Sequence, residues 1–136
     1  MGGITFVRGI TAIPQEHEIG FTCNGNGAAV TTGEKVSIAV PYSGYIESWS
    51  MMADVPGSAV IDIWKSPAPV FPTVTESICG FSKPFLGDYI QYAESGEETS
   101  TLDDWNRTIN EDDILTFNID SVDGTITRLV LILRIL

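Results

Sequence analysis

The sequence predicts an all-β fold, an antiparallel β-sandwich in a single domain. Polar and apolar residues alternate along several runs, such as residues 36–40 and 114–119, and this period of two is typical of strands with one buried face. Turn-forming residues separate the runs, most clearly the Asn-Gly pairs of residues 24–27 and the Asp-Gly pair of 123–124. At 136 residues the chain has the size of one domain.

Residues 1–16 and 17–136 differ in character. The first segment is too irregular for an amphipathic helix and too apolar for a linker, so we expect an extended N-terminal arm that packs on a neighbour, with a frayed terminus as the alternative. The sandwich then occupies residues 17–136, and its first strand is expected at 17–23.

Residues 33–65 are expected to form a β-meander of three consecutive strands. The strands fall at residues 36–40, 45–53 and 60–65, where the alternation is clear. Two proline- and glycine-containing reversals, at 41–44 and 54–58, separate them. A meander is marginal alone, so the rest of the chain should supply a second layer.

The second half of the chain is less regular. Three prolines between residues 67 and 72 exclude a helix or a central strand there. An aromatic-rich loop is expected at 80–92 and a polar tip at 93–100. The expected strands lie at residues 75–79, 101–109, 114–119 and 125–135.

The last strand is apolar on both faces between Leu129 and Leu133. Such a strand must be covered on both sides. Because the core covers only one side, we expect Val130 and Ile132 to contact a partner subunit.

The formal net charge of −11 argues against a nucleic-acid partner and against an anionic membrane surface. The chain shows no signal peptide, and its longest apolar run is far shorter than the ~20 residues of a membrane-spanning helix. We expect no membrane insertion. No cofactor is expected either, although the acidic side chains leave a bound Ca²⁺ as an alternative to a merely solvated surface.

Catalytic chemistry finds little support in the sequence. His17, the one histidine, lies between two glutamates near a chain end and is expected on the surface. It leaves no zinc set and no serine triad with a nucleophile elbow. The two cysteines, Cys23 and Cys79, are compatible with one disulfide or with two free thiols. We therefore expect no enzyme; a carbohydrate-active enzyme with two opposed carboxylates is the alternative.

Carbohydrate binding is better supported, because Tyr and Trp rings stack on sugars. The three tryptophans lie on expected strands and are assigned to the core: Trp49, Trp64 and Trp105. Aromatic residues of the 80–92 segment are expected in a loop at the end of a rigid sandwich, where binding sites are often built. The candidate ligand-binding residues are Phe85, Tyr89 and Tyr92.

Several blocks in sequence order resemble a domain of bacteriophage virion proteins. They are Thr-Thr-Gly-Glu-Lys (31–35), Val-Pro-Tyr-Ser-Gly (40–44), Gly-Ser-Ala-Val-Ile-Asp-Ile-Trp-Lys (57–65), and residues 71–73, 77–78, 83–84, 102–105 and 113–118. The chain resembles, over residues 17–133, the C-terminal knob-like domain of tail-fibre and minor structural proteins. It departs from that family in residues 80–100, which carry more aromatic and acidic side chains, and in its length.

The resemblance implies a jelly-roll-like sandwich, a homotrimeric knob and a place in the virion, assembled in the host cytoplasm beside other virion proteins. It implies attachment to a host-surface receptor, for which a glycan is the expected class. The alternative is a purely structural capsid or tail decoration protein that binds no receptor.

Overall fold

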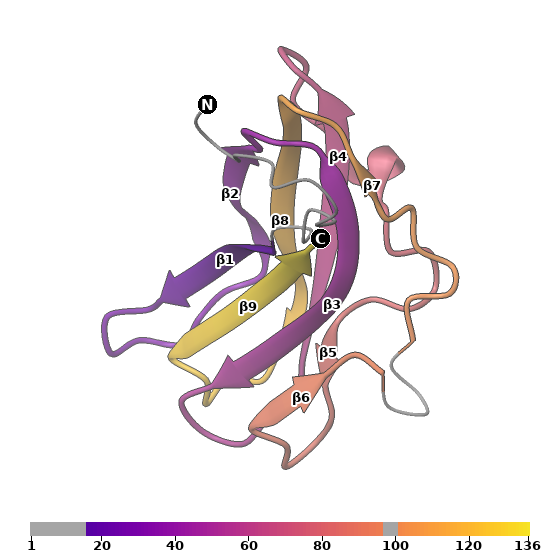
Figure 1. Ribbon diagram of the computed structural model, residues 1–136. Helices are drawn as coiled ribbons and strands as arrows, with labels where there is room; N and C mark the ends of the chain where they lie inside the picture. Colours follow the sequence, from indigo (N-terminus) through magenta and orange to yellow (C-terminus); the bar gives the residue numbers. More distant parts are fainter. Residues whose placement is uncertain (1–15, 97–100) are drawn as a thin grey trace.

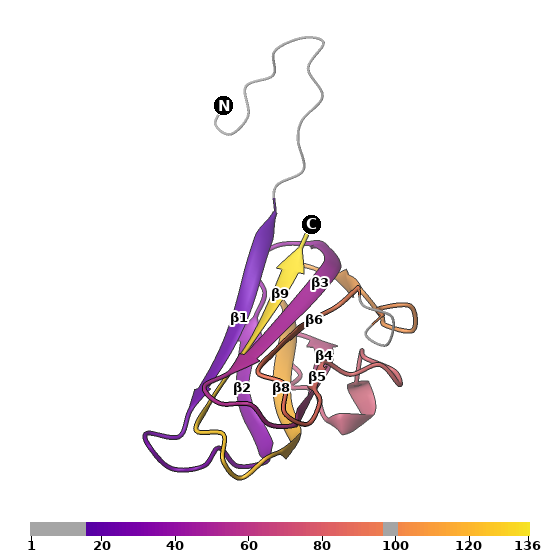
Figure 2. The same ribbon diagram turned by 90° about the horizontal axis from the view of Figure 1, so that it is seen from below.

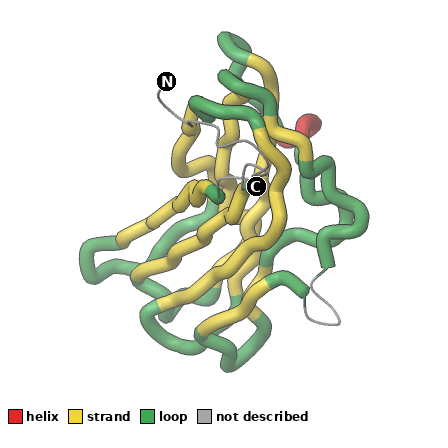
Figure 3. Tube along the Cα trace, viewed as in Figure 1, coloured by secondary structure: helices red, strands yellow, loops and turns green. Residues whose placement is uncertain are grey.

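A computed structural model describes residues 16–96 and 101–136, and these form two antiparallel β-sheets packed face to face (Figures 1 and 2). Strands and connecting loops make up nearly all of this part of the chain (Figure 3). The expected arm at residues 1–15 lies outside the described residues. The elements are β1 (His17–Asn24), β2 (Gly33–Ala39), β3 (Gly44–Ala53), β4 (Ala59–Pro67), the 3₁₀ helix η1 (Val74–Glu76), β5 (Phe85–Leu86), β6 (Tyr92–Glu94), β7 (Thr108–Ile109), β8 (Asp113–Val122) and β9 (Arg128–Ile135).

The strand order is that of a jelly roll. Sheet A has the order β1-β9-β3-β6, with β7 also paired to β3, and sheet B has the order β2-β8-β4-β5. The early strands thus run beside the late strands in reverse order, with β1 on β9, β2 on β8, β3 on β6 and β4 on β5. One long antiparallel ribbon wound across two sheets in this way is the eight-stranded jelly roll. The predicted all-β sandwich is confirmed.

The expected meander over residues 33–65 is wrong. β2 and β4 both pair with β8 in sheet B, whereas β3 lies in sheet A between β9 and β6. Alternation of polar and apolar residues shows which side of a strand is buried but carries no information about its neighbour. Tight turns between consecutive strands therefore led to an incorrect pairing, because here each reversal passes the chain from one sheet to the other.

The core fills the space between the two sheets. Alternate residues of β9 are fully buried on its inner side: Leu129, Leu131, Leu133 and Ile135. Across the sandwich, the rings of Phe21 on β1 and Phe117 on β8 stack with their centroids 5.3 Å apart. A jelly roll of this size thus satisfies the apolar residues on one side of each strand.

A β-bulge changes the facing of side chains in β3. The register between β3 and β9 shifts between Ile46 and Ser48. Ile46 is therefore buried on the same side as Trp49 and Met51, although strict alternation assigns Ile46 to the face of Ser48. The extra residue, Glu47, stays exposed.

Two expected strands are wrong or much shortened. In place of a strand at residues 75–79 the chain forms η1, where the carboxylate of Glu76 accepts a hydrogen bond from the backbone N–H of Thr73. Only Thr108–Ile109 of the expected strand 101–109 pairs with a neighbour. Trp105 nevertheless packs in the core as expected, and its indole N–H donates to the carbonyl of Ser82 at 2.7 Å.

A buried carboxylate holds the loops against the outer side of sheet B. Asp62 on β4 is 1% exposed. Its Oδ1 accepts from the backbone N–H of Ile63 (2.9 Å) and the hydroxyl of Ser77 (2.6 Å), and its Oδ2 accepts from the indole N–H of Trp64 (3.0 Å). Lys83 Nζ lies 3.7 Å from Oδ2 and 2.6 Å from Asp120 on β8. This network explains why Trp64 is buried outside the main core.

Another carboxylate ties the β3–β4 loop to the start of β9. Asp54 accepts from the hydroxyl of Thr127 at 2.6 Å and from the backbone N–H groups of Thr127 and Arg128, each at 3.0 Å. The Thr127 hydroxyl, followed by these amides, lowers the pKa of Asp54 below its usual range.

Both cysteines are free thiols. Cys79 is fully buried, and burial raises the pKa of its thiol, whereas Cys23 on β1 is half-buried. His17 is half-buried at the start of β1, with its ring stacked on Tyr42 at 4.0 Å between centroids.

Candidate functional site

The outer face of sheet A carries side chains in rows that cross the strands. Residues paired across neighbouring strands point to the same side, so the register defines each row. One row is Thr22, Val130, Met52 and Tyr92. The next is Gly20, Ile132, Ser50 and Glu94, and a third is Glu18, Arg134 and Ser48. The face therefore changes from apolar to charged in the direction of the chain termini.

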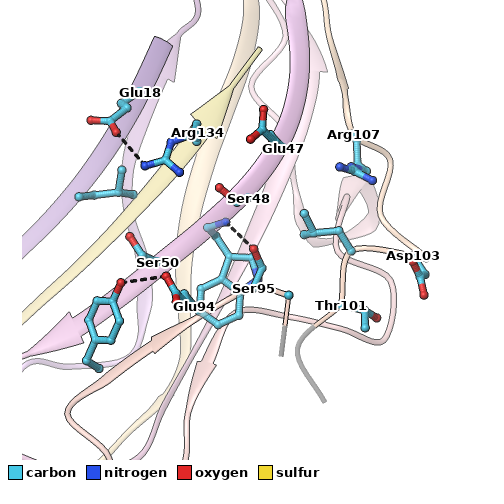
Figure 4. Close-up of a pocket in the computed structure, with 15 residues that line it drawn as sticks. Glu18, Glu47, Ser48, Ser50, Glu94, Ser95, Thr101, Asp103, Arg107 and Arg134 are labelled. Carbon is cyan, nitrogen blue, oxygen red and sulfur yellow. Dashed lines mark hydrogen bonds and ion pairs between the residues drawn. The ribbon is translucent and has the colours of Figure 1, made fainter. Parts of the chain in front are cut away.

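A groove of about 670 Å³ lies over the second and third rows and is walled by the segments on either side of residues 97–100 (Figure 4). Its lining combines carboxylates, guanidinium groups, hydroxyls and a few apolar side chains. The lining residues are Glu18, Glu47, Ser48, Trp49, Ser50, Tyr92, Glu94, Ser95, Gly96, Thr101, Leu102, Asp103, Arg107, Ile132 and Arg134.

The groove lies where β3 has no strand neighbour on one edge. β6 pairs with residues 50–52 of β3 and β7 with residues 44–45, which leaves a gap between them. In that gap Ser95 bonds both backbone groups of Trp49, each at 2.9 Å. Arg107 does the same for Ile46, with its carbonyl accepting from the Ile46 N–H and its Nε donating to the Ile46 carbonyl, both at 2.8 Å. Two loop residues thus replace a missing strand and form one wall.

The charged side chains of the groove differ in how they are engaged. Arg134 contacts Glu18 at 3.6 Å and also Glu16 at 3.0 Å. The guanidinium of Arg107 lies over the ring of Tyr45, 4.5 Å from its centroid. Among residues 16–96 and 101–136, the side chains of Glu47 and Asp103 have no hydrogen-bond or ion-pair partner.

The lining suits a polyhydroxyl ligand. Free carboxylate oxygens accept hydrogen bonds from hydroxyls, and charge-assisted bonds of this kind are the stronger class. Tyr92 is 51% exposed at the rim, where its ring can lie against the apolar face of a sugar. Its hydroxyl donates to Glu94 at 3.1 Å, which fixes both side chains.

One buried polar atom borders the groove. Trp49 is 2% exposed, and its Nε1 has no hydrogen-bond partner within the described part of the chain. A buried N–H in this condition destabilises the fold rather than binding a ligand, because the atom itself is inaccessible.

The structure separates the three predicted ligand residues. Tyr92 lines the groove, whereas Tyr89, 88% exposed, lines a second pocket of about 390 Å³ with Asp88 and Asp123. Phe85 lies on β5, half-buried opposite Val60. Of these residues, Tyr92 alone lies in the groove.

The predicted interface residues, Val130 and Ile132, lie half-buried on the outer face of sheet A, and Ile132 also lines the groove. The sequence analysis did not identify Glu47, Asp103 and Arg107 as site residues. The one local signal was the double polar step Glu47-Ser48 inside an otherwise alternating strand, which marks the bulge.

Two searches of the described residues gave no positive result. No group of three or more His, Cys, Asp or Glu side chains is placed to hold a metal ion. None of the helical segments described has the length and apolar character to cross a membrane.

No family model matches the sequence, and no curated protein does. The solved structures include one likeness, "Structure of infectious bursal disease virus Gx strain", at 10% identity and a TM-score of 0.25. The match covers 99% of this chain and 41% of the viral chain, so the protein spans well under half of that chain's length. A TM-score this low does not establish a common fold or a common function.

Proposed function

We propose that the protein is a bacteriophage virion structural protein whose knob-like jelly roll attaches to a glycan on the host surface. The groove on the outer face of sheet A is the observation that carries this proposal. It combines a half-exposed aromatic ring, unpaired carboxylates and a cavity of about 670 Å³, which is within the range of small-ligand sites. The sequence resemblance supports the virion location. No catalytic role is proposed.

The test is binding of the protein to a glycan array and to host cells, with two tyrosine variants. Tyr92→Ala removes the ring at the rim of the groove, and we expect an affinity loss of about tenfold, the size of one aromatic contact. Tyr89→Ala is the matched control, because Tyr89 is also an exposed tyrosine but lies at the second pocket. Absence of any glycan binding, or equal loss in both variants, would overturn the proposal.

A second function, a decoration or assembly role without a receptor, is favoured by the apolar row on the same face. Val130 and Met52 are neighbours there, and Met52 is 42% exposed. We propose that identical copies bury this row in a homotrimer. Sedimentation at micromolar concentration should then give three chains, and Val130→Lys should dissociate them. A stable wild-type monomer contradicts the trimer.

The two proposals meet at Ile132, which borders both the apolar row and the groove. A trimer that buries Val130 therefore places a neighbouring copy beside the ligand. If the groove stays open in the trimer, Val130→Lys should separate the chains without abolishing glycan binding. If binding also disappears, the glycan site is shared between copies.

A further inference from the structure

The charges that line the groove indicate which class of sugar it accepts. Resting on the glycan-binding function proposed above, we infer that the groove selects a neutral, hydroxyl-rich sugar and excludes acidic sugars such as uronates and sialic acids. Such selection is a property of named groups in the groove and can fail while glycan binding itself stands.

Carboxylates outnumber cations in the groove. Its lining carries four carboxylates and two guanidinium groups. Two of the carboxylates, those of Glu47 and Asp103, have no partner among the described residues, so their charge is not offset by a neighbour. An anionic ligand placed between them is repelled, and the whole-chain charge of −11 adds to that repulsion.

Neither arginine is free to act as a fork for an incoming carboxylate. Arg134 is bound by Glu16 at 3.0 Å and by Glu18 at 3.6 Å. Arg107 donates its Nε to the carbonyl of Ile46 and lies over an aromatic ring. Bidentate recognition of a carboxylate needs a guanidinium edge with two parallel N–H groups, and these contacts hold both side chains in other roles.

The same groups suit hydroxyl donors. Figure 4 shows the labelled Glu47, Glu94 and Asp103 around the groove, together with the hydroxyls of Ser48 and Ser50 on β3. Carboxylate oxygens only accept hydrogen bonds, so a ligand rich in O–H groups satisfies them without bringing its own negative charge.

The experiment uses matched pairs of immobilised oligosaccharides of equal length: glucan beside glucuronan, galactan beside galacturonan, and mannan beside mannuronan. We expect binding to at least one neutral member, with its uronate bound at least about fivefold more weakly, as two nearby surface carboxylates would produce. The preference should shrink as salt is added, because screening weakens the repulsion.

The double variant Glu47→Gln/Asp103→Asn removes the two unpaired charges, and we expect it to bring the uronate close to its neutral partner. Glu34→Gln/Glu111→Gln is the control, since it changes the net charge equally at exposed positions outside the groove and should keep the preference. Equal or tighter binding of uronates by the wild type overturns this inference and leaves the glycan function intact. Binding to no sugar of either class overturns both.

Discussion

Asp62 offers the sharpest test of how the outer loops are held on the sandwich. The replacement Asp62→Asn keeps the shape of the side chain but removes its charge. With the amide carbonyl in the place of Oδ1, the new side chain can still accept from Ile63 and Ser77, but its NH₂ group then faces the indole N–H of Trp64 and the Lys83 ammonium. The opposite orientation of the amide loses two hydrogen bonds instead of one.

The size of the effect follows from those contacts. A hydrogen bond from a neutral donor to a buried carboxylate contributes roughly 1.5–3 kcal/mol, and the half-exposed Lys83 pair adds less than about 1 kcal/mol. We therefore expect Asp62→Asn to lower the free energy of unfolding by about 2–4 kcal/mol. With a urea m-value of about 1–3 kcal/mol/M, the unfolding midpoint should fall by roughly 1–2 M.

Urea titration followed by far-UV circular dichroism measures this change, with Trp64→Phe as the second arm of a double-mutant cycle. Because a phenylalanine ring has no N–H, Asp62→Asn should be milder in the Trp64→Phe background, by about 1–2 kcal/mol. Asp120→Asn, which removes only the exposed partner of Lys83, should change the free energy by less than about 1 kcal/mol. A shift below about 0.5 kcal/mol for Asp62→Asn, or strict additivity with Trp64→Phe, would falsify the role assigned to this carboxylate.

Three further outcomes are expected. Trp49→Phe removes an indole N–H that has no partner in the described chain and should change the free energy of unfolding by no more than about 1 kcal/mol, whereas Trp105→Phe breaks a hydrogen bond and should cost about 1–2 kcal/mol more; urea titration compares them. The pKa of Asp54 is lower folded than unfolded, so its stabilisation is present above the unfolded pKa and is lost as pH falls through the folded one; the advantage of wild type over Asp54→Asn should shrink toward about pH 3, as unfolding midpoints measured across pH would show. Pulsed alkylation read by mass spectrometry should modify Cys23 in the folded protein and Cys79 only after unfolding, and equal rates would contradict the burial of Cys79.

The sequence was sufficient to predict the main strands because their burial is written in local alternation. Residues 114–119 and the last strand were recognised from pattern alone; β8 extends the first of these by a few residues, and β9 lies within the range expected for the second. Pairing was not predictable in this way, since the partner of each strand is set by contacts between distant segments. The same limit explains η1, where the capping by Glu76 prevailed over the strand pattern.

The site was predicted less completely than the fold. Tyr92 was found because an aromatic residue in a loop region is visible in the sequence. The unpaired Glu47 and Asp103 were not found, because they come from segments far apart in the sequence that meet only at the gap along β3. Acidic residues are common in this chain, so nothing local distinguishes these two from the others.

The pairing of β1 with β9 determines how the domain responds to force. His17 lies opposite Ile135, so the start of β1 and the end of β9 lie at the same end of the sandwich (Figure 2). Tension between these two ends opens the pair one hydrogen bond at a time, as a zipper opens. Tension between His17 and a ligand held in the groove, in contrast, pulls β1 lengthwise along β9 and loads all the residue pairs of the register together. A protein that is anchored through β1 and grips its ligand on sheet A would thus meet mechanical load in its more resistant direction.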